Sequence, residues 1–122
     1  MSVQKKNNFP SEKLELYEKL VATNPNVKRR GATHPYTSLN GHMFSYLHPS
    51  CSVALRLPKD EREKFLEKYK TRLFEAYGVV QKEYVTVPDT LLRNTKELKT
   101  YFERSFQYVQ TLKPKASRKK QK

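Results

Sequence analysis

Hydrophobic residues recur along the chain at two different spacings, and each spacing predicts a different kind of element. From Ser11 to Val21, apolar residues recur every three or four positions, which is typical of a helix with one buried side. Pro25 ends this pattern, because proline has no amide hydrogen and restricts the residue before it. The apolar positions of this predicted helix are Leu14, Tyr17, Leu20 and Val21.

Residues 36–57 read instead as strands interrupted by two turn signals. Asn40-Gly41 is the strongest short hairpin signal, because both central residues of a type I′ turn need positive φ. Pro49-Ser50 is the second signal, since proline suits the first central position of a tight turn. Two such turns predict a three-stranded antiparallel meander.

If both loops have two residues, the register of the meander follows from alternation along each strand. Leu39 then opposes His42 and Thr37 opposes Phe44. Across the second turn, Tyr46 opposes Val53 and His48 opposes Cys51. The predicted buried face holds Leu39, Phe44, Tyr46, Val53, Leu55 and Leu57, and the predicted polar face holds Tyr36, Ser38, Ser45, Ser52, Ala54 and Arg56.

The rest of the chain predicts a helix, a strand and a final helix. Asp60 with Glu63 is a candidate cap for the first of these helices, and Gly78 indicates a turn before Val79-Val80. Residues 84–87 predict a short strand that Pro88 ends. Asn94 followed by Glu97 resembles a capping box at the start of the last helix. Because strands are grouped and flanked by helices, the predicted class is α+β, with an antiparallel sheet built on the meander plus a later strand.

Residues 11–112 are expected to form one domain between polar, disordered ends at residues 1–10 and 113–122. No apolar run approaches the roughly 18 residues that span a bilayer, so we expect no membrane association. The lone Cys51 cannot form an internal disulfide, which suits a reducing compartment. A cytoplasmic location is therefore expected.

The formal net charge of +13 is concentrated at the ends of the chain. Residues 1–10 carry two lysines and residues 113–122 carry six basic residues, with no acidic residue in either segment. Such a tail either binds polyanions without sequence preference or serves only to keep the protein in solution. The candidate contact residues for nucleic acid or a partner are Lys28, Arg29, Arg30, Tyr36, Arg56, Lys115, Arg118, Lys119 and Lys120.

The usual catalytic and cofactor motifs do not occur in the sequence, which has only three glycines. Zinc-binding residue types do occur, at His34, His42, His48 and Cys51. His42 and His48 are about 20 Å apart if they share a strand, and His34 opposes Leu47 in the predicted register. Two close residues do not hold a zinc ion. We therefore expect no metal, no cofactor and no catalytic residue, with a His48–Cys51 enzyme or metal site as a minor alternative.

Aromatic residues on the last predicted helix permit two interpretations. Tyr101, Phe102, Phe106 and Tyr108 can stack on bases beside the basic tail. Their spacing also fits a helix that packs on a sheet, where aromatic residues dominate small cores. We favour core packing.

Four segments in order resemble the TfoX/Sxy N-terminal domain. Residues 31–44 contain Asn40-Gly41-His42-Met43-Phe44, which is similar to that family's "nGkmf". The stretches VALRLP (residues 53–58), EYVTVPDTLL (residues 83–92) and the last helix are similar to "lkLp", "yvxvPeellxd" and "Lxxwvxxsxxya". The resemblance covers roughly residues 12–112. It implies an α+β domain without catalytic residues, in a family linked to the regulation of natural competence for DNA uptake.

Two departures from the family pattern limit what can be carried over. Residues 32–35 replace the family's methionine-phenylalanine-glycine run, and no segment of these 122 residues is expected to correspond to the helical C-terminal domain of the competence regulators. We therefore predict a non-catalytic regulatory or interaction domain with a protein partner, without assigning it a role in competence. The alternative is a non-specific nucleic-acid-binding protein that acts through its basic ends.

Overall fold

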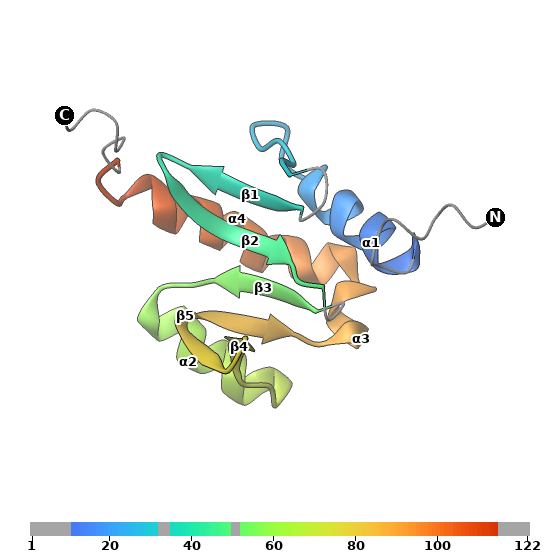
Figure 1. Cartoon of the computed structure of the whole chain (residues 1–122), viewed down its shortest axis with the longest axis vertical. Coiled ribbons are helices and arrows are strands. Elements are labelled where there is room, and N and C mark those ends of the chain that lie inside the picture. Colours follow the sequence, from blue (N-terminus) through green and yellow to red (C-terminus); the bar gives the residue numbers. More distant parts are fainter. Residues whose placement is uncertain (1–10, 32–34, 50–51, 115–122) are drawn as a thin grey trace.

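The computed structural model describes residues 11–31, 35–49 and 52–114. A five-stranded antiparallel sheet has the order β1-β2-β3-β5-β4, and the helices pack on one of its faces (Figure 1). The elements are α1 (Ser11–Val21), β1 (Tyr36–Leu39), β2 (His42–Leu47), β3 (Val53–Arg56), α2 (Lys59–Tyr69), β4 (Leu73–Ala76), β5 (Val79–Val87), α3 (Asp89–Leu92) and α4 (Thr95–Gln110). Among the described residues, no helix is long and apolar enough to cross a membrane.

The predicted α+β class and the three-stranded meander are confirmed, and the structure adds two elements. Strand β4 and the short helix α3 were not predicted, because each spans only four residues and shows no clear periodicity. The turn expected at Gly78 joins β4 to β5, with φ of 78° at the glycine. The predicted cap of α2 is wrong: the helix begins at Lys59 after Pro58, without a side-chain cap.

The first hairpin has the predicted turn but only part of the predicted register. Asn40 and Gly41 have φ of 56° and 84°, as a type I′ turn requires, and Leu39 opposes His42. A bulge then places Thr37 opposite Ser45 rather than Phe44. Because a bulge inserts one extra residue and bends its strand, Phe44 and Ser45 are both buried on the side of the helices.

The second turn is one residue longer than predicted, which shifts every pair between β2 and β3. The His48 amide donates to the Ser52 carbonyl oxygen at 2.8 Å, so three residues form the loop. Tyr46 consequently opposes Ala54 instead of Val53. A shift of one residue exchanges the two faces of a strand, so the expected burial of Tyr46 beside Phe44 is wrong, and Leu47 faces the core instead.

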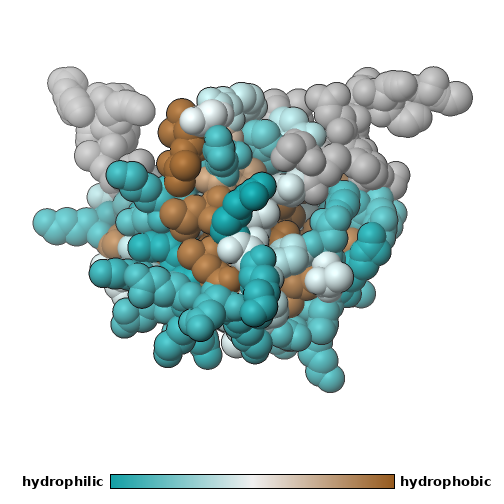
Figure 2. Space-filling model, turned by 90° about the horizontal axis from the view of Figure 1, so that it is seen from below, coloured by the Kyte–Doolittle hydropathy of each residue, from teal (hydrophilic) through white to brown (hydrophobic). Residues whose placement is uncertain are grey.

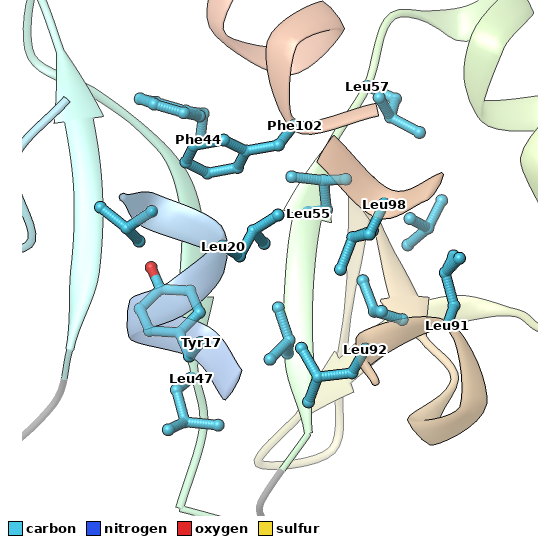
Figure 3. Close-up of a cluster of buried hydrophobic side chains, with 14 of the residues drawn as sticks. Tyr17, Leu20, Phe44, Leu47, Leu55, Leu57, Leu91, Leu92, Leu98 and Phe102 are labelled. Atoms are coloured by element: carbon cyan, nitrogen blue, oxygen red, sulfur yellow. The ribbon is translucent and has the colours of Figure 1, made fainter. Parts of the chain in front are cut away.

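The main core lies between the sheet and the helices, and Figure 3 shows its residues from α1, α3 and α4. Phe65 adds a residue from α2. Phe102 of α4 packs on Phe44 of β2, with ring centroids 5.5 Å apart, and Phe106 packs on the same ring at 5.9 Å. The favoured interpretation of the α4 aromatic residues as core is thereby confirmed. Asn94 caps α4 as predicted, since its side chain accepts from the Glu97 amide.

Helices α2 and α4 are also joined by an aromatic and polar contact. Tyr69 donates to the Glu97 carboxylate, and its ring packs against Tyr101 with centroids 5.7 Å apart. Burial and the Glu97 carboxylate both raise the pKa of the Tyr69 phenol above its ordinary value. These contacts therefore join α2 to α4 within the helical layer.

The β4–β5 hairpin bends away from the rest of the sheet. Leu73 pairs with Val85, but Phe74 pairs with Gln81, so an irregularity separates the two parts of β5. The second part of β5 pairs with β3, and Val85 in it also pairs with Leu73 of β4, whereas the first part pairs only with β4. This bend brings the hairpin to the face of the sheet opposite the helices, where Phe74 packs on Tyr46.

Candidate functional site: the uncovered face of the sheet

Five ring-bearing side chains gather on the sheet face opposite the helices. Alternation along β5 places Val85 and Val87 in the main core and Tyr84 on the other side, where Ala54 forms a second small cluster. We call the following set the aromatic face: Tyr46, His48, Phe74, Tyr77 and Tyr84. The sequence does not reveal this set, because it depends on the loop after His48 and on the irregularity in β5.

Four rings of the aromatic face follow one another across the surface. The centroids of Tyr84 and Tyr46 are 5.8 Å apart, those of Tyr46 and His48 are 6.4 Å apart, and those of His48 and Tyr77 are 5.2 Å apart. Phe74 supports the row from β4, with its ring edge-on to Tyr46 at 5.5 Å. The row therefore joins β5, β2 and the β4–β5 turn into one continuous surface.

The most exposed large hydrophobic residues of the described chain lie on or beside this face. Tyr77 is 82% exposed, Val79 is 59% exposed and Val80 is 47% exposed, all at the tip of the β4–β5 hairpin. Met43, at 36%, is joined to the face by a hydrogen bond of 2.6 Å from the Tyr84 hydroxyl to its carbonyl oxygen. In Figure 2, which views the side where α2, β4 and β5 lie, hydrophobic residues interrupt a mostly hydrophilic surface.

Tyr77 has an unusual backbone conformation. Its φ of 53° lies in the left-handed region, where β-hairpin turns normally carry asparagine or glycine. The equivalent position of the β1–β2 hairpin is Asn40, with φ of 56°. A bulky residue with positive φ is strained, and such strain concentrates at functional sites. The hairpin thus carries a costly and highly exposed tyrosine at its tip.

Arg56, a candidate contact residue, borders the aromatic face but already has a carboxylate partner. Its guanidinium contacts the Glu83 carboxylate at 2.6 Å and lies over the rings of Tyr84 and Tyr108 at 6.0 and 5.7 Å. Burial raises the pKa of Tyr84, and the positive charge of Arg56 opposes this effect. Arg56 therefore positions Tyr84 rather than offering a free charge.

The other candidate contact residues do not form a single cluster. Tyr36 opposes Tyr46 and so shares its face, and Arg30 forms a bridge with Tyr36 at the β1 edge. Arg29 is held by Glu18 at 2.5 Å, whereas Lys28 is exposed. The tail candidates Lys115, Arg118, Lys119 and Lys120 lie outside the described residues.

Two basic residues that sequence analysis did not select line a hollow beside the aromatic face. Lys70 and Arg72, together with Thr71 and Thr86, surround a space of about 410 Å³. Thr86 lies two residues beyond Tyr84, so it lies on the same side of β5. Within the described part of the chain, neither Lys70 nor Arg72 has a carboxylate within ion-pair distance. Lys70 and Arg72 do not stand out as candidate contact residues in the sequence, because basic residues are common throughout it.

The histidines occupy unrelated places in the structure. His42 Nε2 hydrogen bonds to the Lys113 carbonyl oxygen at 2.7 Å near the end of α4, whereas the His48 ring packs on Phe74 at 5.4 Å. His34 and Cys51 lie outside the described residues, and so does the expected proximity of Cys51 to His48. Within residues 11–31, 35–49 and 52–114, no group of three or more His, Cys, Asp or Glu residues can hold a metal ion.

No family model, no curated protein and no solved structure matches this chain. The function is therefore inferred from the geometry of the aromatic face and from the sequence resemblance described above.

The stability of the protein is expected to fall above pH about 10, in part because of the aromatic face. Burial, followed by the neighbouring phenols of Tyr84 and Tyr77, raises the pKa of Tyr46 from 10.0 to about 12. The folded chain therefore holds this proton more tightly than the unfolded chain. The resulting stability is fully present below pH 10.0 and is lost as the pH rises towards about 12.

Urea unfolding followed by circular dichroism, at pH values from about 8 to about 11, measures this dependence. The unfolding midpoint should decline less steeply above pH about 10 in Tyr46→Phe, which has no phenol to ionise. Equal slopes for the parent and the variant would contradict the prediction.

Proposed function

We propose that this chain is a non-catalytic interaction or regulatory domain, similar to the TfoX/Sxy N-terminal domain, that binds its partner through the aromatic face. The observation that carries the proposal is the exposure of Tyr77, Val79 and Val80 beside a continuous row of rings. Contiguous apolar patches of this kind mark interaction sites on soluble proteins. Tyrosine is also enriched where binding energy is concentrated.

The one-sided architecture supports the same proposal. The helices pack on one face of the sheet and form the main core with it. The residues of the opposite face are therefore not needed to complete that core. A tyrosine with positive φ at the tip is costly for the fold alone. A cytoplasmic location and a regulatory role belong to this proposal. The family resemblance favours a protein partner, whereas the positive charge beside the face, considered below, favours a nucleic acid.

A second candidate function is nucleic-acid binding through the basic ends. The charge distribution favours it, because residues 113–122 carry six basic residues and no acidic residue. Exposed Lys28 and Arg30 add charge at the β1 edge. This candidate predicts affinity that falls steeply with salt and depends on the tail.

Site-specific photo-crosslinking tests the proposed function. With benzoylphenylalanine in place of Tyr77, we expect a discrete cross-linked product in the cells that produce the protein. The same group in place of Lys99, which is exposed on α4, should give no such product. Excess unmodified protein should suppress the cross-link, and excess Val79→Lys should not, because a lysine there disrupts the apolar patch. Absence of any product from position 77 would contradict an interaction at this face.

A further inference from the structure

Resting on the proposed interaction function, we propose that the aromatic face binds single-stranded nucleic acid, with bases stacked on its rings and phosphates beside Lys70 and Arg72. The site combines the two features that such ligands need: aromatic rings, of which Tyr77 is exposed and Tyr46, His48 and Tyr84 are partly buried, and adjacent positive charge. Uncovered faces of antiparallel sheets that carry aromatic residues serve this purpose in other nucleic-acid-binding domains.

The spacing of the rings favours a single strand over a duplex. Successive centroids from Tyr84 through Tyr46 and His48 to Tyr77 lie 5.2 to 6.4 Å apart, and adjacent ring planes are inclined by 57° to 66°. Bases along a duplex strand are about 3.4 Å apart and stack on one another, so their faces are not free. An extended strand can splay its bases to a wider spacing and place them on separate rings.

The charge around the face favours a polyanion over a second copy of this chain. Lys70 and Arg72 line their hollow without a carboxylate partner in the described residues. Glu83, a carboxylate at the border of the face, is already paired with Arg56. Two copies that met through this face would bring like charges together in a protein of net charge +13, whereas a phosphate backbone would neutralise them.

The conformation of Tyr77 adds a reason to expect a ligand at the hairpin tip. Asparagine would fit the left-handed conformation better, as Asn40 does in the other hairpin, yet the tip carries a ring that is 82% exposed. An added side chain at the next residue, Gly78, would meet nothing within 4 Å, so the tip is open to an incoming strand. A base that stacks on Tyr77 would explain why the hairpin tip carries an exposed aromatic ring.

The test measures binding of the full chain to fluorescently labelled oligonucleotides of about 12 units, within the range of known site sizes. Oligouridine, oligothymidine and a duplex of the same length form the three arms, titrated at low and moderate salt. We expect both single strands to bind more tightly than the duplex. The ratio of the affinities for oligouridine and oligothymidine then shows whether the site prefers RNA or DNA.

Tyr77→Asn is the decisive variant, because it removes the ring and relieves the backbone strain. We expect single-strand binding to weaken by about 5- to 100-fold, the range for loss of one stacked base. The melting temperature should stay equal or rise, so misfolding cannot explain the loss. Tyr77→Phe keeps the ring and should bind as the parent does.

The double variant Lys70→Gln with Arg72→Gln tests the phosphate contacts. It should reduce the slope of log affinity against log salt by about 1 to 2. Its charge-matched control is Lys96→Gln with Lys99→Gln on α4, which should leave the slope unchanged because α4 covers the other face.

Three outcomes would overturn the inference. One is the absence of single-strand binding by the full chain at low salt. Another is unchanged affinity in Tyr77→Asn together with loss of binding on deletion of residues 113–122, which would assign binding to the tail. The third is a dimer that Tyr77→Asn dissociates, in a chain that binds no oligonucleotide. In that last case the proposed interaction function would stand, because only the class of partner would be wrong.

Discussion

Phe102→Ala is expected to lower the free energy of unfolding by about 3 to 5 kcal/mol, the largest effect of any single substitution proposed for this protein. Phe102 is completely buried, and its ring packs on Phe44 where α4 crosses β2 (Figure 3). Truncation removes apolar surface from the core and leaves a cavity that the fixed helix and strand cannot close. Domains of this size unfold with about 5 to 15 kcal/mol, so the loss is a large fraction of the total.

Chemical denaturation of the parent and the variant measures this loss. Phe106→Ala is the matched control, because Phe106 contacts the same Phe44 ring at 5.9 Å but is only partly buried. Phe106→Ala should lower the free energy of unfolding by distinctly less than Phe102→Ala, because part of the Phe106 side chain already contacts water. Similar losses for the two variants would show that the α4–β2 contact does not form the centre of the core.

Ser45→Ala should destabilise the protein by about 1 to 3 kcal/mol, although it removes a single oxygen atom. The Ser45 hydroxyl hydrogen bonds with the Tyr17 hydroxyl at 2.7 Å and with Thr37 Oγ1 at 2.6 Å, and all three residues are buried. Without Ser45, the hydroxyls of Tyr17 and Thr37 lose a partner away from water. Burial already raises the pKa of Tyr17 above its ordinary value, which indicates how poorly this site is solvated.

Replacing the whole network separates lost hydrogen bonds from lost packing. The triple variant Tyr17→Phe, Thr37→Val and Ser45→Ala removes all three hydroxyls and leaves no unpaired group among them. We expect it to be more stable than Ser45→Ala, because replacing both partners of a buried hydrogen bond costs less than removing one. Urea midpoints of the parent and both variants give the comparison. A triple variant less stable than Ser45→Ala would show that packing, and not hydrogen bonding, dominates at this contact.

Local signals in the sequence determined much of the fold. The three- and four-residue spacing of apolar positions located α1 and the buried side of α4, and Asn94 with Glu97 marked the start of α4. Asn40-Gly41 located the first hairpin, because its turn type requires positive φ at two adjacent residues. Each of these features depends on neighbours a few residues away, which are visible in a linear sequence.

The aromatic face, in contrast, was decided only by tertiary structure. One bulge in β2 and one extra residue in the loop after His48 moved Ser45 into the core and Tyr46 out of it. A single-residue shift exchanges the faces of a strand, and neither irregularity has a strong local signal. The packing of Phe44 on Phe102 and the polar contact of Ser45 with Tyr17 stabilise the observed register.

The α+β class and the meander were therefore predictable from periodicity and turn signals. The proposed site was not, because Tyr46, Phe74 and Tyr84 come from three strands whose side-chain directions depend on register and on the irregularity in β5. The register is determined by packing of the strands against the helices. That packing consists of many weak contacts between residues far apart in the sequence, so no short stretch of sequence reveals it.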